Sequence, residues 1–150
     1  MKNLFDAARV QEVTGRIAQL TPDSTRRWGK MNVSQMLAHC SVGIETATGV
    51  QKPPRVLVGR ILGPVIKPFA FRNDDPMRKN SPTAPIFIIE DDREFGAEQA
   101  KLSGLVERFG AAGPACCTDH SHAFFGRLQP DEWAILMYKH VDHHLRQFGV

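Results

Sequence analysis

Two histidines near the end of the chain have the spacing of metal ligands on one helix. His140 and His144 are four residues apart, which places both side chains on the same face of an α-helix. At 100° per residue from Trp133, the two rings lie at about −20° and +20°, inside an apolar stripe that includes Met137 and Val141. A divalent cation satisfies two facing nitrogens at once, so the pair indicates a metal site, with hydrogen-bonded core histidines as the alternative.

A third ligand must come from another segment, and His39 is the candidate. Counted from Met36, the apolar stripe of its helix centres at about 55°, and His39 lies on the shoulder at about −60°. Cys40 is more central, at about 40°, and is the alternative ligand. A free cysteine on an apolar face is more often a small packing residue. We therefore favour His39, because a shoulder position in a helical bundle can still face the interior.

The remaining histidines have no assigned role. His143 lies off the stripe, so we expect it at the surface or as a hydrogen-bond partner of a ligand rather than as a ligand. His120 and His122 belong to a loop with the vicinal pair Cys116 and Cys117. Loop histidines are usually solvated, although these two could line the mouth of a site. The chain has no His-Glu-x-x-His sequence, so nothing indicates a zincin-type protease.

Four segments must position these side chains as helices. Apolar residues recur at steps of three and four in residues 4–20, 32–49, 92–109 and 130–148. Asn32 followed by Gln35 is a capping-box pattern at the start of the second segment. Pro130 is a preferred first-turn residue at the start of the last one.

The long segment 51–92 contains seven of the ten prolines. Only residues 56–61 leave room for a short helix there, and residues 85–89 could form a short strand that has no partner. A connection this long is uncommon unless it is functional or packs as a crossover. We therefore predict an all-α, antiparallel four-helix bundle with a long proline-rich crossover between its second and third helices.

Composition limits the class of protein. The chain has 150 residues, which fits one domain over residues 1–150. With 19 basic and 16 acidic residues the net charge is +3, which gives no support to nucleic-acid binding. Three cysteines, no signal-peptide pattern and an interrupted apolar stretch at 56–71 favour a reduced, soluble, cytoplasmic protein without a membrane partner.

Several segments together resemble a known family. Residues 28–31 and 34–40 (WGKM and SQMLAHC) look like the second-helix signature of an uncharacterised bacterial family in the DinB/YfiT-like superfamily. Residues 138–148 are similar to the last helix of that family, and residues 76–85 and 124–126 also fit its pattern. The resemblance covers nearly the whole chain and is strongest in the two histidine-bearing helices.

The resemblance implies an antiparallel four-helix bundle, often dimeric, whose metal ligands match His39, His140 and His144. Imidazole ligands suit zinc, nickel or iron, and the sequence does not choose among them. Some relatives transfer low-molecular-weight thiols such as bacillithiol or mycothiol to electrophiles. Ser121-His122-Ala123 stands where the family has His-Pro, so no family role passes to His122.

We therefore expect a metal-dependent transferase that conjugates a low-molecular-weight thiol to a small electrophile, with a homodimer as the implied assembly. Three neutral ligands leave an open position at which a thiol would be held as thiolate. A metal-dependent hydrolase is the alternative enzyme, since a bound ion lowers the pKa of water to about 7. A non-catalytic bundle that binds a metal or a small ligand is the alternative of another class.

Overall fold

The computed structural model describes residues 1–150, and all of its regular structure is helical. There are five α-helices, two short 3₁₀ turns and no strands. The α-helices are α1 (Ala7–Ala18), α2 (Val33–Ala47), α3 (Leu57–Ala70), α4 (Phe95–Ala112) and α5 (Pro130–Gln147), and the 3₁₀ turns are η1 (Pro85–Phe87) and η2 (Gly113–Cys116).

Side-chain caps define where the helices that carry the histidines begin. The Asn32 side chain accepts a hydrogen bond from the backbone N–H of Gln35, and the Gln35 side chain accepts one from the backbone N–H of Asn32. At the start of α5, the Glu132 carboxylate accepts a hydrogen bond from the backbone N–H of Gln129. Caps of this kind satisfy N–H groups that have no partner within the helix. The predicted starts of these two helices are confirmed.

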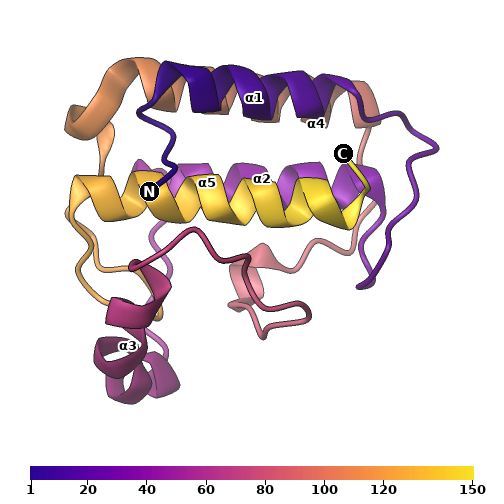
Figure 1. The fold of residues 1–150 in the computed structure, drawn as a ribbon. Coiled ribbons are helices and arrows are strands. Elements are labelled where there is room, and N and C mark those ends of the chain that lie inside the picture. Colours follow the sequence, from indigo (N-terminus) through magenta and orange to yellow (C-terminus); the bar gives the residue numbers. More distant parts are fainter.

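Four long helices pack in two layers. Figure 1 shows α1 and α4 in the upper layer and α2 and α5 in the lower one. The two helices of each layer contact one another, and between the layers α2 contacts α4 while α5 contacts α1. The apolar face of every long helix is buried between the layers. The largest fully buried side chains are Trp133, Phe109, Leu4, Ile17, Met36, Leu37, Ile44, Leu102, Leu145, Val13, Val106 and Val141. The packing places α2 directly beside α5, so side chains of the two helices can meet in one site.

The expectation for the crossover was wrong in one respect. Instead of at most a short helix at 56–61, the segment contains a complete fifth helix, α3, which continues through Pro64 and Pro68. Both prolines are exposed, so the carbonyl groups that they leave without an N–H partner can meet water. Tertiary contacts of α3 therefore outweigh the low helix propensity of proline.

The short strand that residues 85–89 could have formed is also absent. Residues Pro85–Phe87 form a 3₁₀ turn instead, because no second strand is available to pair with them.

None of the helices combines the length and the apolar character that crossing a membrane requires.

Candidate metal centre

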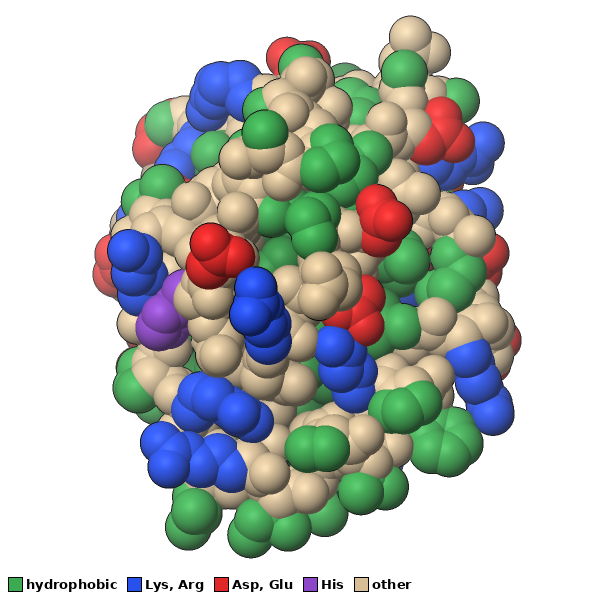
Figure 2. Space-filling model, turned by 90° about the vertical axis from the view of Figure 1, so that its left-hand side faces the viewer, with side chains coloured by type: hydrophobic (Ala, Val, Ile, Leu, Met, Phe, Trp, Pro, Cys, Tyr) green, Lys and Arg blue, Asp and Glu red, His purple; other side chains and the backbone are tan.

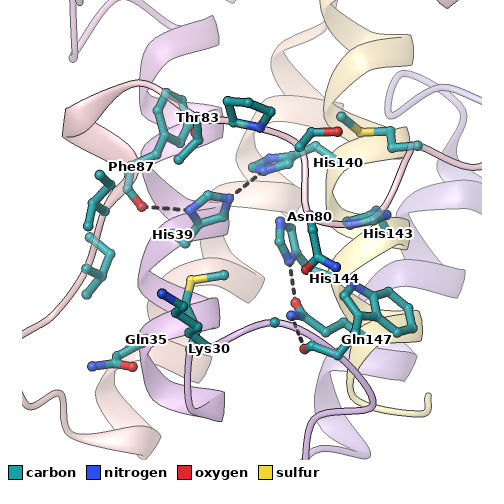
Figure 3. Close-up of a pocket in the computed structure, with 18 of the residues that line it drawn as sticks. Lys30, Gln35, His39, Asn80, Thr83, Phe87, His140, His143, His144 and Gln147 are labelled. Carbon is teal, nitrogen blue, oxygen red and sulfur yellow. Dashed lines mark hydrogen bonds between the residues drawn. The ribbon is translucent and has the colours of Figure 1, made fainter.

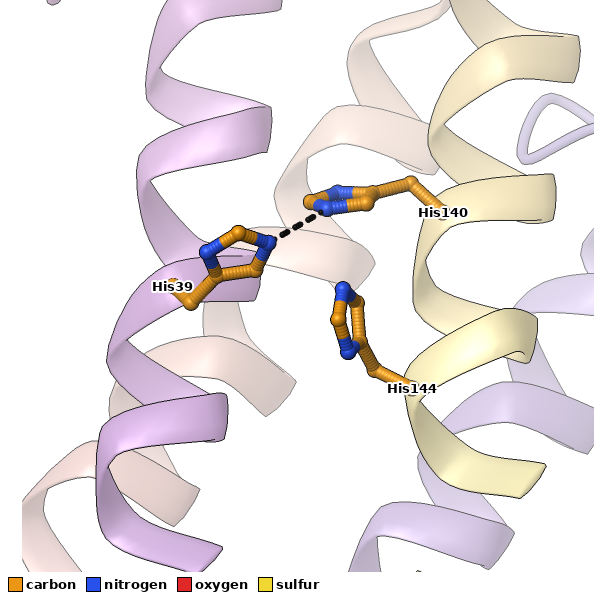
Figure 4. Close-up of side chains that lie close together, drawn as sticks. All are labelled: His39, His140 and His144. Carbon is orange, nitrogen blue, oxygen red and sulfur yellow. Dashed lines mark hydrogen bonds between the residues drawn. The ribbon is translucent and has the colours of Figure 1, made fainter. Parts of the chain in front are cut away.

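Three imidazoles converge in the layer that contains α2 and α5. His39 comes from α2, and His140 and His144 come from successive turns of α5. One ring nitrogen of each lies within 4.8 Å of the others, and the Nε2 atoms of His39 and His140 are 2.9 Å apart (Figure 4). A tetrahedral ion with bonds of about 2.0–2.1 Å separates its ligand nitrogens by roughly 3.3 Å. The spacing therefore fits an ion between the three rings.

A glycine on α2 makes room for His140. Gly43 lies one turn after His39, and a Cβ atom added to it would be only 2.8 Å from Nδ1 of His140. Any larger residue at this position would push the imidazole away from His39. The close approach of α2 to α5 at the site thus depends on the absence of a side chain at residue 43.

The crossover orients His39. Nδ1 of His39 lies 2.8 Å from the backbone carbonyl oxygen of Phe87, in the 3₁₀ turn η1 (Figure 3). A carbonyl oxygen only accepts hydrogen bonds, so Nδ1 carries the proton and donates. Nε2 therefore holds a free lone pair, and this is the nitrogen that faces the other two rings.

A relay of two hydrogen bonds orients His144. The side-chain amide of Gln147 donates from Nε2 to the backbone carbonyl of Trp28 at 2.7 Å, which identifies Oε1 as the free acceptor. Nδ1 of His144 lies 2.7 Å from Oε1 and donates to it. Nε2 of His144 consequently has its lone pair available, as a metal ligand requires.

His140 completes the group through a shared proton. Because Nε2 of His39 has no proton, Nε2 of His140 donates across the 2.9 Å between them. To act as a ligand, this nitrogen must give up its proton to Nδ1 of the same ring. A metal ion bound between His39 and His140 would therefore replace the proton that now lies between their Nε2 atoms.

Burial keeps the three rings neutral. Desolvation is the largest cause that lowers the pKa of each, to about 3 for His144 and well below the ordinary value of 6.5 for His140. The neighbouring imidazoles lower the pKa of His140 and His144 further. At neutral pH all three are thus in the uncharged form that binds metal ions.

The three histidines line one part of a cavity of about 760 Å³ (Figure 3). Its other wall comes from the crossover, residues 77–90, and from the turn that precedes α2. The lining includes two cationic side chains, Lys30 and Arg78, and a single carboxylate, Glu90. Apolar side chains, among them Trp28 and Phe87, supply much of the remaining surface. The cavity is therefore suited to a small molecule that is partly apolar and carries negative charge.

His143 and Cys40 have supporting positions. His143 is not at the surface: it is buried, lines the cavity and packs against the indole of Trp28 with ring centroids 5.6 Å apart. Cys40 is fully buried with its Sγ 3.8 Å from Sδ of Met36, and burial raises the pKa of its thiol. Cys40 thus remains a protonated packing residue, which agrees with the choice of His39 over Cys40.

The two loop histidines lie outside the residues that line the cavity. Nδ1 of His122 accepts hydrogen bonds from the backbone N–H groups of Phe124 and Phe125, at 3.1 Å each. Nε2 of His120 lies 3.1 Å from the carbonyl oxygen of Pro53, which accepts the bond. Both histidines therefore stabilise the loop, and the idea that they line the mouth of the site finds no support.

Sequence reasoning overlooked the partners that orient the ligands. Gln147 could have been found, because it stands three residues after His144 and so lies on the same helical face. Gly43 could have been found in the same way, four residues after His39. The carbonyl of Phe87 has no sequence signal, since every residue offers an equivalent backbone group.

Comparison with models of protein families matches residues 2–149 to the family described as "Protein of unknown function (DUF1569)". No curated protein and no solved structure matches the chain. The family assigns no function to the site, and the kinship with the DinB/YfiT-like superfamily stays a prediction.

Proposed function

The chain belongs to the DUF1569 family of unknown function, and we propose that it is a metal-dependent transferase that joins a low-molecular-weight thiol to a small electrophile. One observation carries the proposal: three neutral imidazoles from two helices present ring nitrogens to one another at the wall of a cavity of about 760 Å³. Part of the same proposal is that α1, α2, α4 and α5 form an antiparallel bundle of the DinB/YfiT-like type, to which α3 is an addition.

His39, His140 and His144 would hold one divalent ion, zinc, nickel or iron, through their Nε2 atoms. The carbonyl of Phe87 and the amide of Gln147 keep the rings of His39 and His144 in the tautomer that this requires. When bound, such an ion supplies the Lewis acidity that stabilises a thiol in its deprotonated form. The histidines contribute no negative charge of their own, so the site favours an anionic fourth ligand.

The cavity supports a reaction between two small molecules. Single ligands of drug size fill cavities of about 300–1,000 Å³, so this one has room for a thiol beside a compact electrophile. Lys30 and Arg78 lie where they can attract the carboxylate of a thiol, while Trp28 and Phe87 offer apolar surface to the electrophile.

In the proposed reaction the thiol loses its proton to bulk water. The sulfur lone pair then forms a C–S bond with the electrophilic carbon as the bond to the leaving group breaks. The leaving group departs with that electron pair, so no oxidant or reductant is needed. The three histidines would fix the position of the ion, and with it the sulfur, in the cavity that Trp28 and Phe87 also line.

A conjugation assay with monochlorobimane tests the proposal. Metal-loaded protein is expected to accelerate conjugation of at least one thiol in a panel of cysteine, glutathione, bacillithiol and mycothiol, with release of chloride. His144→Ala should abolish the acceleration. His120→Ala, the same substitution outside the cavity, should retain it. Absence of activity with every thiol after metal loading, or full activity in His144→Ala, would overturn the proposal.

A further inference from the structure

Helix α3 carries an apolar stripe that faces away from the rest of the protein. Seven of the ten exposed large hydrophobic residues of the chain are on this one helix, with exposed fractions from 40% to 74%. They are Leu57, Val58, Ile61, Leu62, Val65, Ile66 and Phe69. Their spacing places them on one side of a helix. Figure 1 shows α3 set apart from the four long helices, and Figure 2 shows apolar side chains gathered along the lower edge of this face.

Two glycines hold α3 with the stripe outward. A Cβ atom at Gly59 would lie 2.6 Å from Cα of Phe124, and one at Gly63 would lie 2.2 Å from the carbonyl oxygen of Phe124. The glycine side of the helix is therefore in direct contact with the backbone of the loop before α5. Lys67 strengthens the attachment through an ion pair with Glu132 at 2.8 Å. Because the glycine side of α3 packs against the loop, the opposite side, which carries the apolar stripe, faces outward.

We propose that the α3 stripe is the interface of a symmetric homodimer, in which it packs against the same stripe of a second copy of the chain. At roughly 150 Å² for a fully exposed large apolar side chain, the exposed fractions of the seven residues amount to about 600 Å² per subunit. Stable interfaces bury about 600–1,000 Å² per partner. Covering α3 alone thus reaches the lower end of that range, and a patch of this size rarely stays exposed without a function.

The distribution of apolar residues favours a two-fold arrangement. The other exposed large hydrophobics, Met1, Val50 and Ile88, lie outside α3, and none belongs to a comparable stripe. A head-to-tail contact needs a second, different patch, whereas a two-fold contact uses the same patch on both subunits. The α3 stripe can therefore form a two-fold dimer without any second apolar patch.

The charges of α3 lie on the side opposite the stripe. An interfacial membrane helix also has Lys and Arg opposite its apolar face, so binding to a membrane is the alternative that the vesicle experiment below must exclude. On α3, Arg60 and Lys67 lie roughly 150–170° from the centre of the stripe, and Lys67 is already paired with Glu132. The stripe itself contains no charged residue, as expected for the core of a protein–protein interface.

Sedimentation equilibrium of the full chain tests the proposal. The wild-type protein is expected to have twice the mass of one chain, and the double variant Ile61→Glu/Val65→Glu to be monomeric, with a dissociation constant raised by roughly 100-fold or more. Val50→Glu places a charge at an equally exposed apolar residue outside α3 and should remain dimeric. Circular dichroism verifies that the variants are folded.

Ile61→Cys provides a second readout that does not depend on a disruptive charge. Near the centre of a two-fold stripe, the introduced cysteine should form a disulfide-linked dimer under mild oxidation, while Val50→Cys should not. A wild-type protein that is monomeric at all concentrations, or a dimer that the double variant leaves intact, would overturn the proposal. So would a monomer that instead binds vesicles of phosphatidylglycerol through α3.

Discussion

The backbone carbonyl of Phe87 accepts a hydrogen bond from Nδ1 of His39 at 2.8 Å. Through this contact, the long connection between α2 and α4 determines which nitrogen of the first predicted ligand faces His140 and His144. The crossover therefore does more than link two helices: it orients a side chain of the candidate metal centre and supplies one wall of the cavity beside it.

Replacing Gln147 with leucine should weaken metal binding. The variant removes the acceptor for Nδ1 of His144 and leaves the carbonyl of Trp28 without its donor. Loss of such an orienting partner typically costs about 10- to 100-fold in metal affinity. Competition with a chromophoric chelator measures the dissociation constant. The exposed Gln19→Leu is the matched control and should bind as the wild type does; equal affinity in the two variants would show that the relay is not needed.

Replacing Gly43 with alanine should weaken metal binding and should not stabilise α2. Alanine favours a helix over glycine by about 0.5–1 kcal/mol, but its Cβ would lie 2.8 Å from Nδ1 of His140 and displace that ring. We expect weaker metal binding without the usual gain in stability. At Gly15 of α1 nothing lies within 4 Å of the added Cβ, so Gly15→Ala should be more stable and bind metal normally. Thermal unfolding measures the stability of each variant, and competition with a chelator measures its metal affinity.

The stability of the metal-free protein should fall with decreasing pH, partly because of His122. Burial, with a smaller effect of Arg55, lowers the pKa of His122 to about 4, against 6.5 in an unfolded chain. Between pH 6.5 and pH 4 the unfolded state binds more protons, so the free energy of unfolding rises with pH and is lost on acidification. His122 contributes up to about 3 kcal/mol to this loss.

His122→Asn keeps a short acceptor for the N–H groups of Phe124 and Phe125 but cannot titrate in this range. Urea unfolding at pH 7, 5.5 and 4 should show a shallower loss of stability in the variant than in the wild type. An identical pH dependence in the two proteins would mean that His122 is not protonated on unfolding.

Metal removal should leave the fold intact. The core between the two helical layers excludes the three histidines and contains side chains from all four long helices. Helix content measured by far-ultraviolet circular dichroism at 25 °C should therefore persist in excess EDTA, while thiol conjugation should cease. Loss of the helical signal in EDTA would instead indicate a metal that serves folding.

The sequence predicts the four long helices and the pair of histidines on α5 because both depend on local spacing, whereas the choice of His39 as the third residue rests on the family resemblance. His140 and His144 share a stripe at a step of four residues, and Asn32 with Gln35 marks where α2 begins. Four amphipathic stripes that must be buried together predict a bundle but not which helices lie side by side, and it is the structure that places α2 against α5. That the three residues bind metal remains a prediction.

The features that escaped prediction depend on contacts between distant segments. Pro64 and Pro68 disfavour a helix locally, yet Gly59 and Gly63 pack so closely on the backbone of Phe124 that α3 forms. The orientation of His39 by a backbone carbonyl leaves no trace in residue types. Neither the outward direction of the α3 stripe nor the wall of the cavity can therefore be derived from periodicity.

The decisive measurement for the three-histidine site is the metal content of the protein, purified without an affinity tag. After incubation with zinc, nickel or ferrous iron and removal of the excess, elemental analysis should find about one equivalent of a transition metal per chain in the wild type. His140→Ala/His144→Ala, which retains only one of the three imidazoles, should hold almost none. Less than a tenth of an equivalent in the wild type with every metal would show that His39, His140 and His144 do not form a metal site.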